Sequence, residues 1–353
     1  MKIRETPLKV LGPIGDQSDI DAIGEVIESG WWGKGPKVEE FEQEFAKLVG
    51  AKHAISVTSN SHGQDLVMKA MGFKGIDVIN PTISFVATAQ IPLWNDCTTN
   101  IVDVDSINMN ITAEQVEKYK KPNSEVCIAV NMAGIPAPID EIRKVFGGYI
   151  IEDCAHSPLV KINHKYVGTY GDAAILSFFP TKPIPAGEGG MIIIKDRNIA
   201  NEIRKIRDYG KFKDANGATK HILPAFPNAR LNEYSATVAN TILKNYTDLL
   251  RFKTKIANYY NSRIDNELIF SKIYSDEIIT EFSYYKYITF FKESKYKTAQ
   301  VYDSDNQLIS ILKDNSLKYK FFGEDEFARD HICLPITYSM STDDAQMILD
   351  NTF

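Results

Sequence analysis

Lys182 stands out among the lysines of the sequence because prolines and glycines surround it. The stretch from Ala174 to Asp196 reads AILSFFPTKPIPAGEGGMIIIKD, and two apolar runs typical of strands enclose the lysine. Proline fixes φ and removes a backbone donor, while glycine permits turns that other residues avoid, so this connection is stiff. We expect a reactive amine held beside a buried strand; the alternative is an ordinary solvated loop lysine.

Two further candidates, Asp153 and His156, lie in the segment GGYIIEDCAHSPLV. Asp153 directly follows an apolar run of the kind expected for a buried strand. Open α/β sheets bind ligands at the carboxyl ends of their strands, so a carboxylate at this position can contact a ligand. It can also cap the next helix, and the histidine can be a core or capping residue.

Small polar residues form a third candidate in the segment VTSNSHGQD. Ser59, Asn60, Ser61 and His62 follow a strand-like run and precede a helix-like run. Backbone N–H groups at such a helix start, together with serine hydroxyls, suit a phosphate group. An ordinary Ser or Asn helix cap fits the same residues. Phe85, after NPTIS, can serve a ligand or pack in the core.

These candidates together fit one cofactor, pyridoxal phosphate. The cofactor needs an amine for its aldehyde, a carboxylate for its ring nitrogen, donors for its phosphate and usually an aromatic platform. Lys182, Asp153, the segment 59–61 and Phe85 would supply these four groups. A ring nitrogen paired with a carboxylate stays protonated and accepts electrons when the substrate loses its α-proton. The lysine amine can then move that proton.

The elements that must position these groups alternate along the first two thirds of the chain. Between about residues 16 and 226, short apolar runs alternate with runs whose apolar residues recur at helical spacing. This alternation predicts an α/β fold whose mixed, mostly parallel sheet is covered by helices on both faces. The glycines before Met191 lead into a strand rather than a helix, which argues against a dinucleotide-binding turn.

The pattern of apolar and polar residues changes after about Leu231. A long helical stretch, NEYSATVANTILKNYTDLLRFKTKIANYYNSRI, leads into a segment that alternates strands and helices. We therefore predict a large cofactor-binding domain over residues 1–235. A smaller C-terminal α+β domain, joined by the long helix, would cover residues 236–353.

Composition excludes several classes of protein. The chain has 353 residues and a net charge of −6, which argues against a broad surface for nucleic acid or anionic membranes. Its apolar runs are shorter than the roughly 20 residues of a spanning helix, and the first residues lack the apolar core of a signal peptide. The four cysteines are scattered without a CxxC pair. We expect a cytoplasmic protein with reduced thiols and no metal, nucleic-acid or membrane binding.

The sequence resembles the DegT/DnrJ/StrS family of sugar aminotransferases nearly from end to end. The similar blocks are SGWWGKGPKVEEFEQEFAKLVGAKHAISVTS, NPTISFVATAQ, IVDVD, IIEDCAHS, VGTYGDAAILSFFPTKPIPAGEGGMI, NARLNEYSA and CLPITYSMSTDD. The most specific block is SFFPTK followed by GEGG. The resemblance implies the fold of aspartate aminotransferase, known as fold type I of pyridoxal phosphate enzymes. It also implies transfer of an amino group, with glutamate as the donor, to a nucleotide-linked keto sugar.

The resemblance implies roles for the residues around the cofactor ring. Lys182 would bind the cofactor covalently, and Asp153 would pair with its pyridine nitrogen. His156 falls where the family places a histidine or glutamine beside the ring oxygen. Phe85 matches the aromatic residue that stacks on the ring.

The resemblance also implies how the phosphate is bound. Ser177 would contact it together with the loop of Ser61 and His62. Asn228 matches an asparagine that reaches the phosphate from the neighbouring subunit. The active unit implied by the resemblance is therefore a homodimer with active sites at its interface.

The chain departs from the family pattern at the phosphate loop. The family usually reads S-G-T-x-A-L, whereas Asn60 here replaces the glycine and Ser61 keeps the hydroxyl of the threonine. His62 and Gln64 stand where small or apolar residues are common, and they can reach a ligand or merely pack. The segment LPAFPNAR and Asn131 also differ from the usual pattern, which puts the substrate in doubt.

The identity of the substrate is the open part of the sequence-based hypothesis. Lys34 and Arg230 carry charges suited to the phosphates of a nucleotide, and Trp31 and Trp32 are available for stacking. Each also fits a surface charge or an interface aromatic. A 4-keto-6-deoxyhexose is favoured because it is frequent in the family, and a 3-keto sugar is the alternative. A related dehydratase, in which histidine replaces the lysine, is disfavoured by Lys182; a catalytically idle sensor or structural relative is a further alternative.

Overall fold

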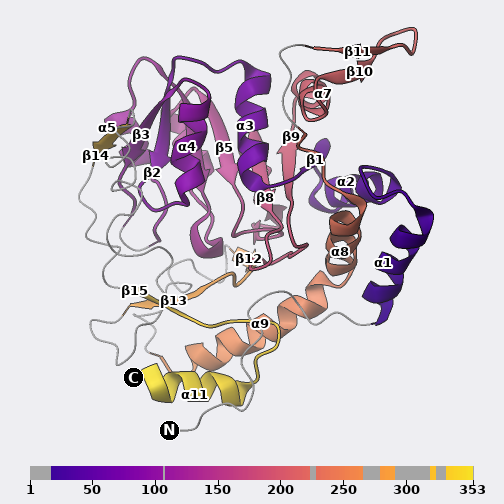
Figure 1. Cartoon of the computed structure of the whole chain (residues 1–353). Coiled ribbons are helices and arrows are strands. Elements are labelled where there is room, and N and C mark those ends of the chain that lie inside the picture. The colour runs from indigo at the N-terminus through magenta and orange to yellow at the C-terminus, as the bar shows by residue number, and fades with distance from the viewer. Residues whose placement is uncertain are drawn as a thin grey trace.

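The computed structural model is built around an eight-stranded sheet and describes residues 17–105, 108–222, 228–264, 279–290, 319–322 and 331–352 (Figure 1). In spatial order the strands are β1 (His53–Val57), β9 (Gly190–Ile194), β8 (Ala173–Ser177), β5 (Tyr149–Asp153), β4 (Ser124–Val130), β2 (Asp77–Pro81), β3 (Thr98–Val102) and β14 (Tyr319–Phe322). β9 is antiparallel to β1 and β8, and the other neighbours pair in parallel. The predicted α/β fold with a mixed, mostly parallel sheet is confirmed.

Helices cover both faces of this sheet, as predicted from the sequence. They are α2 (Pro36–Val49), α3 (Asn60–Met71), α4 (Val86–Trp94), α5 (Ala113–Tyr119), α6 (Ile139–Val145), α7 (Arg197–Ile206) and α8 (Glu233–Lys244). Ile151 of β5 packs in a core with α3, α4 and α7, whereas its neighbour Ile150 packs with α5 and α6. Successive strand residues point to opposite faces, so these strands are buried on both sides and their sequences are continuously apolar.

Shorter elements surround the central layers. They are α1 (Gln17–Ser29), the 3₁₀ helix η1 (Met132–Gly134), β6 (Lys161–Ile162), β7 (Lys165–Tyr166), β10 (Lys211–Lys213) and β11 (Thr219–His221). β10 and β11 pair as an antiparallel hairpin that projects from the body of the protein in Figure 1. β12 (Ile279–Glu281) pairs with β6 in a separate small sheet, and in the segment that follows β12 the Ser283 hydroxyl donates to the His156 carbonyl oxygen at 2.7 Å.

The stretch predicted as one long helix is two helices, α8 and α9 (Tyr246–Asn261), which meet at Asn245. α8 packs against α2 in the core on one face of the sheet. α9 packs against α11 (Thr342–Thr352) in a separate core near the strand pair β13 (Tyr287–Phe290) and β15 (His331–Leu334). The predicted domain boundary between residues 235 and 236 stays a prediction.

The described helices are short. The longest, α9, has 16 residues and carries charged side chains along its length. Within the ranges that the structure describes, no helix is long and apolar enough to cross a membrane.

Candidate active site

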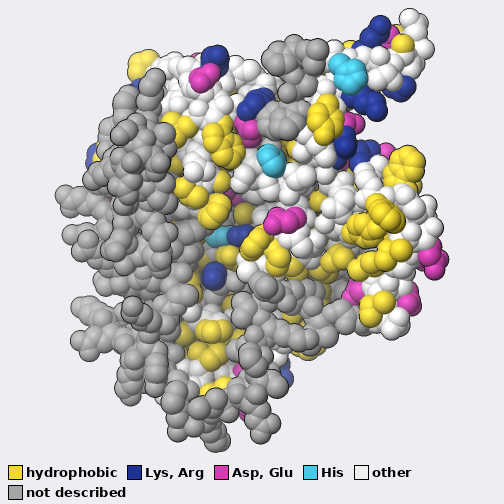
Figure 2. Space-filling view, viewed as in Figure 1, with side chains coloured by type: hydrophobic (Ala, Val, Ile, Leu, Met, Phe, Trp, Pro, Cys, Tyr) yellow, Lys and Arg dark blue, Asp and Glu magenta, His cyan; other side chains and the backbone are white. Residues whose placement is uncertain are grey.

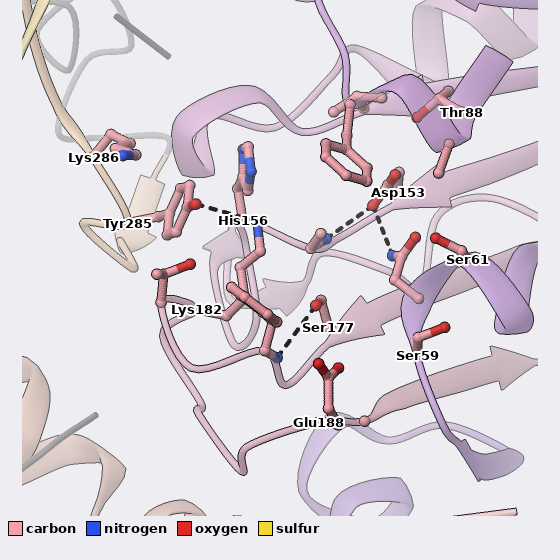
Figure 3. Close-up of a pocket in the computed structure, with 18 residues that line it drawn as sticks. Ser59, Ser61, Thr88, Asp153, His156, Ser177, Lys182, Glu188, Tyr285 and Lys286 are labelled. Carbon is pink, nitrogen blue, oxygen red and sulfur yellow. Dashed lines mark hydrogen bonds between the residues drawn. The ribbon is translucent and has the colours of Figure 1, made fainter. Parts of the chain in front are cut away.

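A cavity of about 410 Å³ lies at the carboxyl ends of the central strands, where α/β sheets bind ligands (Figure 3). Eight of the residues singled out from the sequence line it: Ser59, Asn60, Ser61, Phe85, Asp153, His156, Ser177 and Lys182. They follow or end four different strands, β1, β2, β5 and β8. One edge of the sheet therefore brings together side chains that are far apart in the sequence.

Lys182 lies on the loop that connects β8 to β9. The loop is held by backbone hydrogen bonds, among them Lys182 N to Phe179 O at 2.9 Å and Ala186 N to Phe178 O at 2.8 Å. The Lys182 amine donates to the Tyr285 hydroxyl at 3.2 Å. Burial lowers the pKa of Lys182 to about 8, although the Asp153 carboxylate opposes this shift. About a tenth of the amine is therefore neutral and nucleophilic at pH 7, far more than for a lysine with its ordinary pKa.

Asp153 is the last residue of β5, and its carboxylate is buried in the wall of the cavity. Its Oδ1 atom accepts hydrogen bonds from Ala155 N and Asn60 Nδ2, both at 3.0 Å. Its Oδ2 atom accepts one from Gln64 Nε2 at 2.8 Å. Burial raises the pKa of Asp153, and these donors together with the Lys182 charge act in the opposite direction.

His156 is buried next to the cavity with its ring stacked on that of Tyr285 at a centroid distance of 4.1 Å. Its Nδ1 atom accepts a hydrogen bond from Ala133 N at 3.2 Å. Burial, followed by the charges of Lys182 and Lys286, holds the pKa of His156 well below its usual value. The ring is therefore neutral with its proton on Nε2, which makes Nε2 a hydrogen-bond donor.

The N-terminus of α3 and two serine hydroxyls form a site suited to phosphate. Ser59 caps α3, and its hydroxyl accepts a hydrogen bond from His62 N at 3.2 Å. Ser61 and Ser177 also line the cavity. A Cβ at Gly190 would lie 2.7 Å from the Ser59 carbonyl carbon, so only glycine lets β9 approach this loop. Backbone donors and hydroxyls at a helix start are the groups that bind a phosphate.

Other residues singled out from the sequence do not line the cavity. Lys34 forms an ion pair with Glu39 at 2.9 Å, and the Trp31 indole donates to the Lys34 carbonyl oxygen at 2.9 Å. The Trp32 ring lies 6.3 Å from the ring of Tyr234. Their proposed contacts with a nucleotide stay predictions.

Three more of these residues also lie outside the cavity wall. The His62 ring nitrogen Nδ1 lies 2.7 Å from Thr58 Oγ1. Arg230 forms an ion pair with Asp208. Asn228 is exposed, and its side-chain oxygen accepts a hydrogen bond from Arg230 N at 3.0 Å. No contact between Asn228 and the cavity of its own chain is present among the described residues.

Several residues of the cavity were not singled out from the sequence. Tyr285 and Lys286 reach it from the segment after β12, and Thr88 and Glu188 complete the labelled wall in Figure 3. The segment SYYKY leads into β13, which begins at Tyr287, and no pattern in the sequence marks Tyr285 as a neighbour of Lys182. Gln64 departs from the family pattern, but nothing in the sequence indicates its contact with Asp153.

The chain belongs to the DegT/DnrJ/EryC1/StrS aminotransferase family, whose sequence pattern matches residues 13–352. It is 32% identical over 262 residues to the spore coat polysaccharide biosynthesis protein SpsC of Bacillus subtilis, covering 71% of this chain and 67% of that protein. The resemblance predicted from the sequence is therefore confirmed.

Solved structures share the fold of this chain. The aminotransferase PseC of Helicobacter pylori, involved in pseudoaminic acid biosynthesis, aligns with a TM-score of 0.86 at 20% identity over 98% of each chain. GDP-4-keto-6-deoxymannose-3-dehydratase with a trapped PLP–glutamate geminal diamine aligns with a TM-score of 0.83 at 22% identity, over 98% of this chain and all of that one. These likenesses confirm the predicted fold type, and pyridoxal phosphate is the cofactor bound in the second structure.

The side chains of the cavity fit pyridoxal phosphate. They supply two amines, those of Lys182 and Lys286, together with one buried carboxylate, a helix N-terminus with hydroxyls, and a neutral imidazole donor. Phe85 adds an aromatic ring that is 59% exposed at the cavity wall. No group of three or more His, Cys, Asp or Glu residues that could hold a metal occurs within the described ranges. The donor set thus matches the four requirements of the cofactor.

Proposed function

We propose that this protein is a pyridoxal phosphate-dependent aminotransferase that moves an amino group from glutamate to a nucleotide-linked keto-deoxysugar. The observation that carries the proposal is the shared cavity in which the Lys182 amine and the Asp153 carboxylate lie beside the N-terminus of α3. Membership of an aminotransferase family supports the same reaction class. The cytoplasmic location expected from the sequence is part of this proposal.

The cavity residues would each serve one part of the cofactor. Pyridoxal phosphate supplies an aldehyde that takes up an amino group and a ring that accepts electrons. Ser61, Ser177 and the first N–H groups of α3 would bind its phosphate. Asp153 would pair with its ring nitrogen, and the Nε2–H group of His156 would donate to its ring oxygen. Phe85 would cover one face of the ring and exclude water from it.

Lys182 would move the proton of the amino donor. Its pKa of about 8 lets the amine accept a proton and release it again near neutral pH. The Tyr285 hydroxyl, 3.2 Å from Nζ, gives the free amine a fixed position beside the cavity. Tyr285 would thus keep Lys182 in reach of the reacting carbon while the lysine is not bound to the cofactor.

Glutamate is the proposed donor, and two features support it. The related dehydratase structure contains a PLP–glutamate geminal diamine. In this chain Lys286 lies in the cavity wall and forms no ion pair with a carboxylate within the described ranges. A lysine at that position suits a carboxylate of the amino donor.

A nucleotide-linked sugar is the proposed acceptor, with a 4-keto-6-deoxyhexose favoured and a 3-keto sugar as the alternative. The related dehydratase is named for a GDP-linked 4-keto-6-deoxy sugar. SpsC is named for spore coat polysaccharide biosynthesis, and PseC for the biosynthesis of pseudoaminic acid. These relatives support the substrate class, and frequency in the family favours the 4-keto position.

A homodimer is also part of the proposal. Asn228 is exposed and lies outside the cavity wall of its own chain, as expected if it completes the site of a second copy. Exposed apolar side chains gather over α1 and the nearby end of α8 (Figure 2), including Ile20, Ile27, Trp31 and Trp32. Apolar patches of this kind mark protein–protein contacts. Dilution should release cofactor and activity together, and a fully active monomer would contradict the dimer.

The test of the proposal is a product screen. The protein is loaded with pyridoxal phosphate and glutamate and offered 3-keto and 4-keto deoxysugars on dTDP, UDP and GDP carriers. An amino sugar should form from at least one acceptor, and the Lys182→Ala variant should form none. A deoxygenated sugar without an added amino group would indicate a dehydratase, and equal activity on keto acids alone would exclude a sugar aminotransferase.

A further inference from the structure

Two amide side chains of α3, Asn60 and Gln64, form a hydrogen-bonded unit with Asp153. Asn60 Nδ2 donates to Asp153 Oδ1 at 3.0 Å, and Gln64 Nε2 donates to Asp153 Oδ2 at 2.8 Å. The two amides are joined to each other because Gln64 Nε2 also donates to Asn60 Oδ1 at 2.8 Å. They are one helical turn apart, so α3 presents both to the same carboxylate.

The surroundings fix the orientation of both amides. Asn60 Nδ2 also donates to the Ile175 carbonyl oxygen at 3.2 Å, so a rotated amide would place its oxygen against two acceptors. A rotated Gln64 amide would likewise face Asn60 Oδ1 and Asp153 Oδ2 with an oxygen. Only one arrangement gives each acceptor a donor, and it points both NH₂ groups at Asp153.

Burying the Gln64 amide costs free energy, and a role in packing alone does not explain why an amide is present here. Gln64 is fully buried, and its Oε1 atom has no hydrogen-bond partner within the described ranges. A leucine at this position would fill similar space without burying an unpaired acceptor. The amide is thus oriented for its donor, which contacts the carboxylate.

After these hydrogen bonds, the two carboxylate oxygens of Asp153 differ in how many further hydrogen bonds they can accept. Oδ1 already accepts from Asn60 and from Ala155 N, whereas among the described residues Oδ2 accepts from Gln64 alone. A carboxylate oxygen has two lone pairs, so Oδ2 keeps one for a further donor. The donors also favour the charged carboxylate, whose burial otherwise raises its pKa.

We infer that Asn60 and Gln64 are positioning residues that hold Asp153 with one acceptor site of Oδ2 reserved for the ring N–H group of the cofactor. The inference rests on the proposed function, because it requires pyridoxal phosphate in the cavity. It assigns a role to the departure of this phosphate loop from the family pattern: the loop binds the phosphate at its start and supports the ring carboxylate one turn later.

The test compares two ligands that differ only at the ring nitrogen. The full chain, freed of cofactor, is titrated with pyridoxal phosphate and with its deaza analogue, in which C–H replaces the nitrogen. In Gln64→Leu the affinity for pyridoxal phosphate should fall about 10- to 100-fold, the effect of losing a hydrogen bond to a charged group. The affinity for the deaza analogue should change less than about threefold, because that ligand makes no hydrogen bond with Asp153.

Controls separate this role from a general effect on packing. Met68→Leu, at an equally buried position one turn further along α3, should leave both affinities unchanged. If Gln64→Leu does not fold, Asn60→Ala takes its place, because Asn60 is only partly buried. Equal losses for both ligands, or no loss for pyridoxal phosphate, would overturn the inference and leave the proposed function intact. Parent protein that binds neither ligand would overturn both.

Discussion

Replacing Lys253 by methionine should stabilise the protein. This lysine on α9 is 4% exposed, and its Nζ atom donates to the Tyr284 carbonyl oxygen at 3.3 Å and lies 4.5 Å from the centre of the Tyr338 ring. It forms no ion pair with a carboxylate within the described ranges. Burial, together with the charge of Lys286, lowers the pKa of Lys253 to about 7.

The pKa shift sets the size and the pH dependence of the effect. A fall from 10.5 to about 7 corresponds to a cost of about 5 kcal/mol for the charged form in the folded state. Loss of the hydrogen bond to Tyr284 reduces the expected stabilisation by about 1 kcal/mol, and relaxation of the parent around its buried amine reduces this stabilisation further. We expect a net gain of about 3 kcal/mol at pH 6, or about 4 °C in Tm for a chain of this length.

The direction of the pH dependence follows from the pH at which the folded and the unfolded states each release the proton of Lys253. Below pH 7 both states carry the proton on Lys253, so the folded parent bears the full cost. Between about pH 7 and 10.5 the folded state has released the proton and the unfolded state has not, so stability of the parent rises with pH. The advantage of Lys253→Met should therefore shrink steadily over this range.

The assay is thermal unfolding of the parent and Lys253→Met at pH 6, 8 and 10. Lys255→Met is the matched control, since Lys255 is an exposed lysine on the same helix, and its Tm should stay within about 1 °C of the parent. A Lys253→Met variant that is less stable than the parent at pH 6, or equally stabilised at all three pH values, would refute the reasoning.

Three further predictions concern the cavity. Lys182→Ala should abolish turnover and covalent attachment of the cofactor, and borohydride reduction of the parent followed by peptide mapping should label Lys182 and no other lysine. Asp153→Asn should lower kcat by about 10³-fold, or about 4 kcal/mol, with little change in Tm; activity within a few-fold of the parent would reduce Asp153 to a residue that only holds the turn at Ala155 N. Lys286→Met removes a positive charge that lowers the pKa of Lys182, so the midpoint of the pH-dependent reaction of this amine with an acylating reagent should rise above about 8; an unchanged or lower midpoint would contradict the electrostatic account.

The sheet edge and its main ligand candidates could be predicted from the sequence because they depend on local patterns. Asp153 and Ser177 each end an apolar run that is a strand, and after β1 Ser59 caps the helix in whose first turn Ser61 lies. Parallel strands place their carboxyl ends at one edge, so residues at those ends meet without any knowledge of side-chain contacts.

The other contacts of the site depend on packing between distant segments, which local sequence patterns do not predict. Tyr285 meets Lys182 because β12 pairs with β6, a contact between segments more than a hundred residues apart. The break between α8 and α9 at Asn245 is also invisible in the sequence, since both helices keep an apolar face through it. Gln64 stood out as unusual, yet its orientation depends on acceptors from β5 and α3 together.

The central claim, that this cavity performs amino transfer on pyridoxal phosphate, is tested most directly by a single half-reaction. Protein loaded with the cofactor is mixed with glutamate in the absence of any sugar, and 2-oxoglutarate and the absorbance of the bound cofactor are measured. The account predicts one equivalent of 2-oxoglutarate per active site, with loss of the absorbance of the lysine-bound cofactor, and none from Lys182→Ala. Protein that binds the cofactor at Lys182 but releases no 2-oxoglutarate from glutamate would contradict the account.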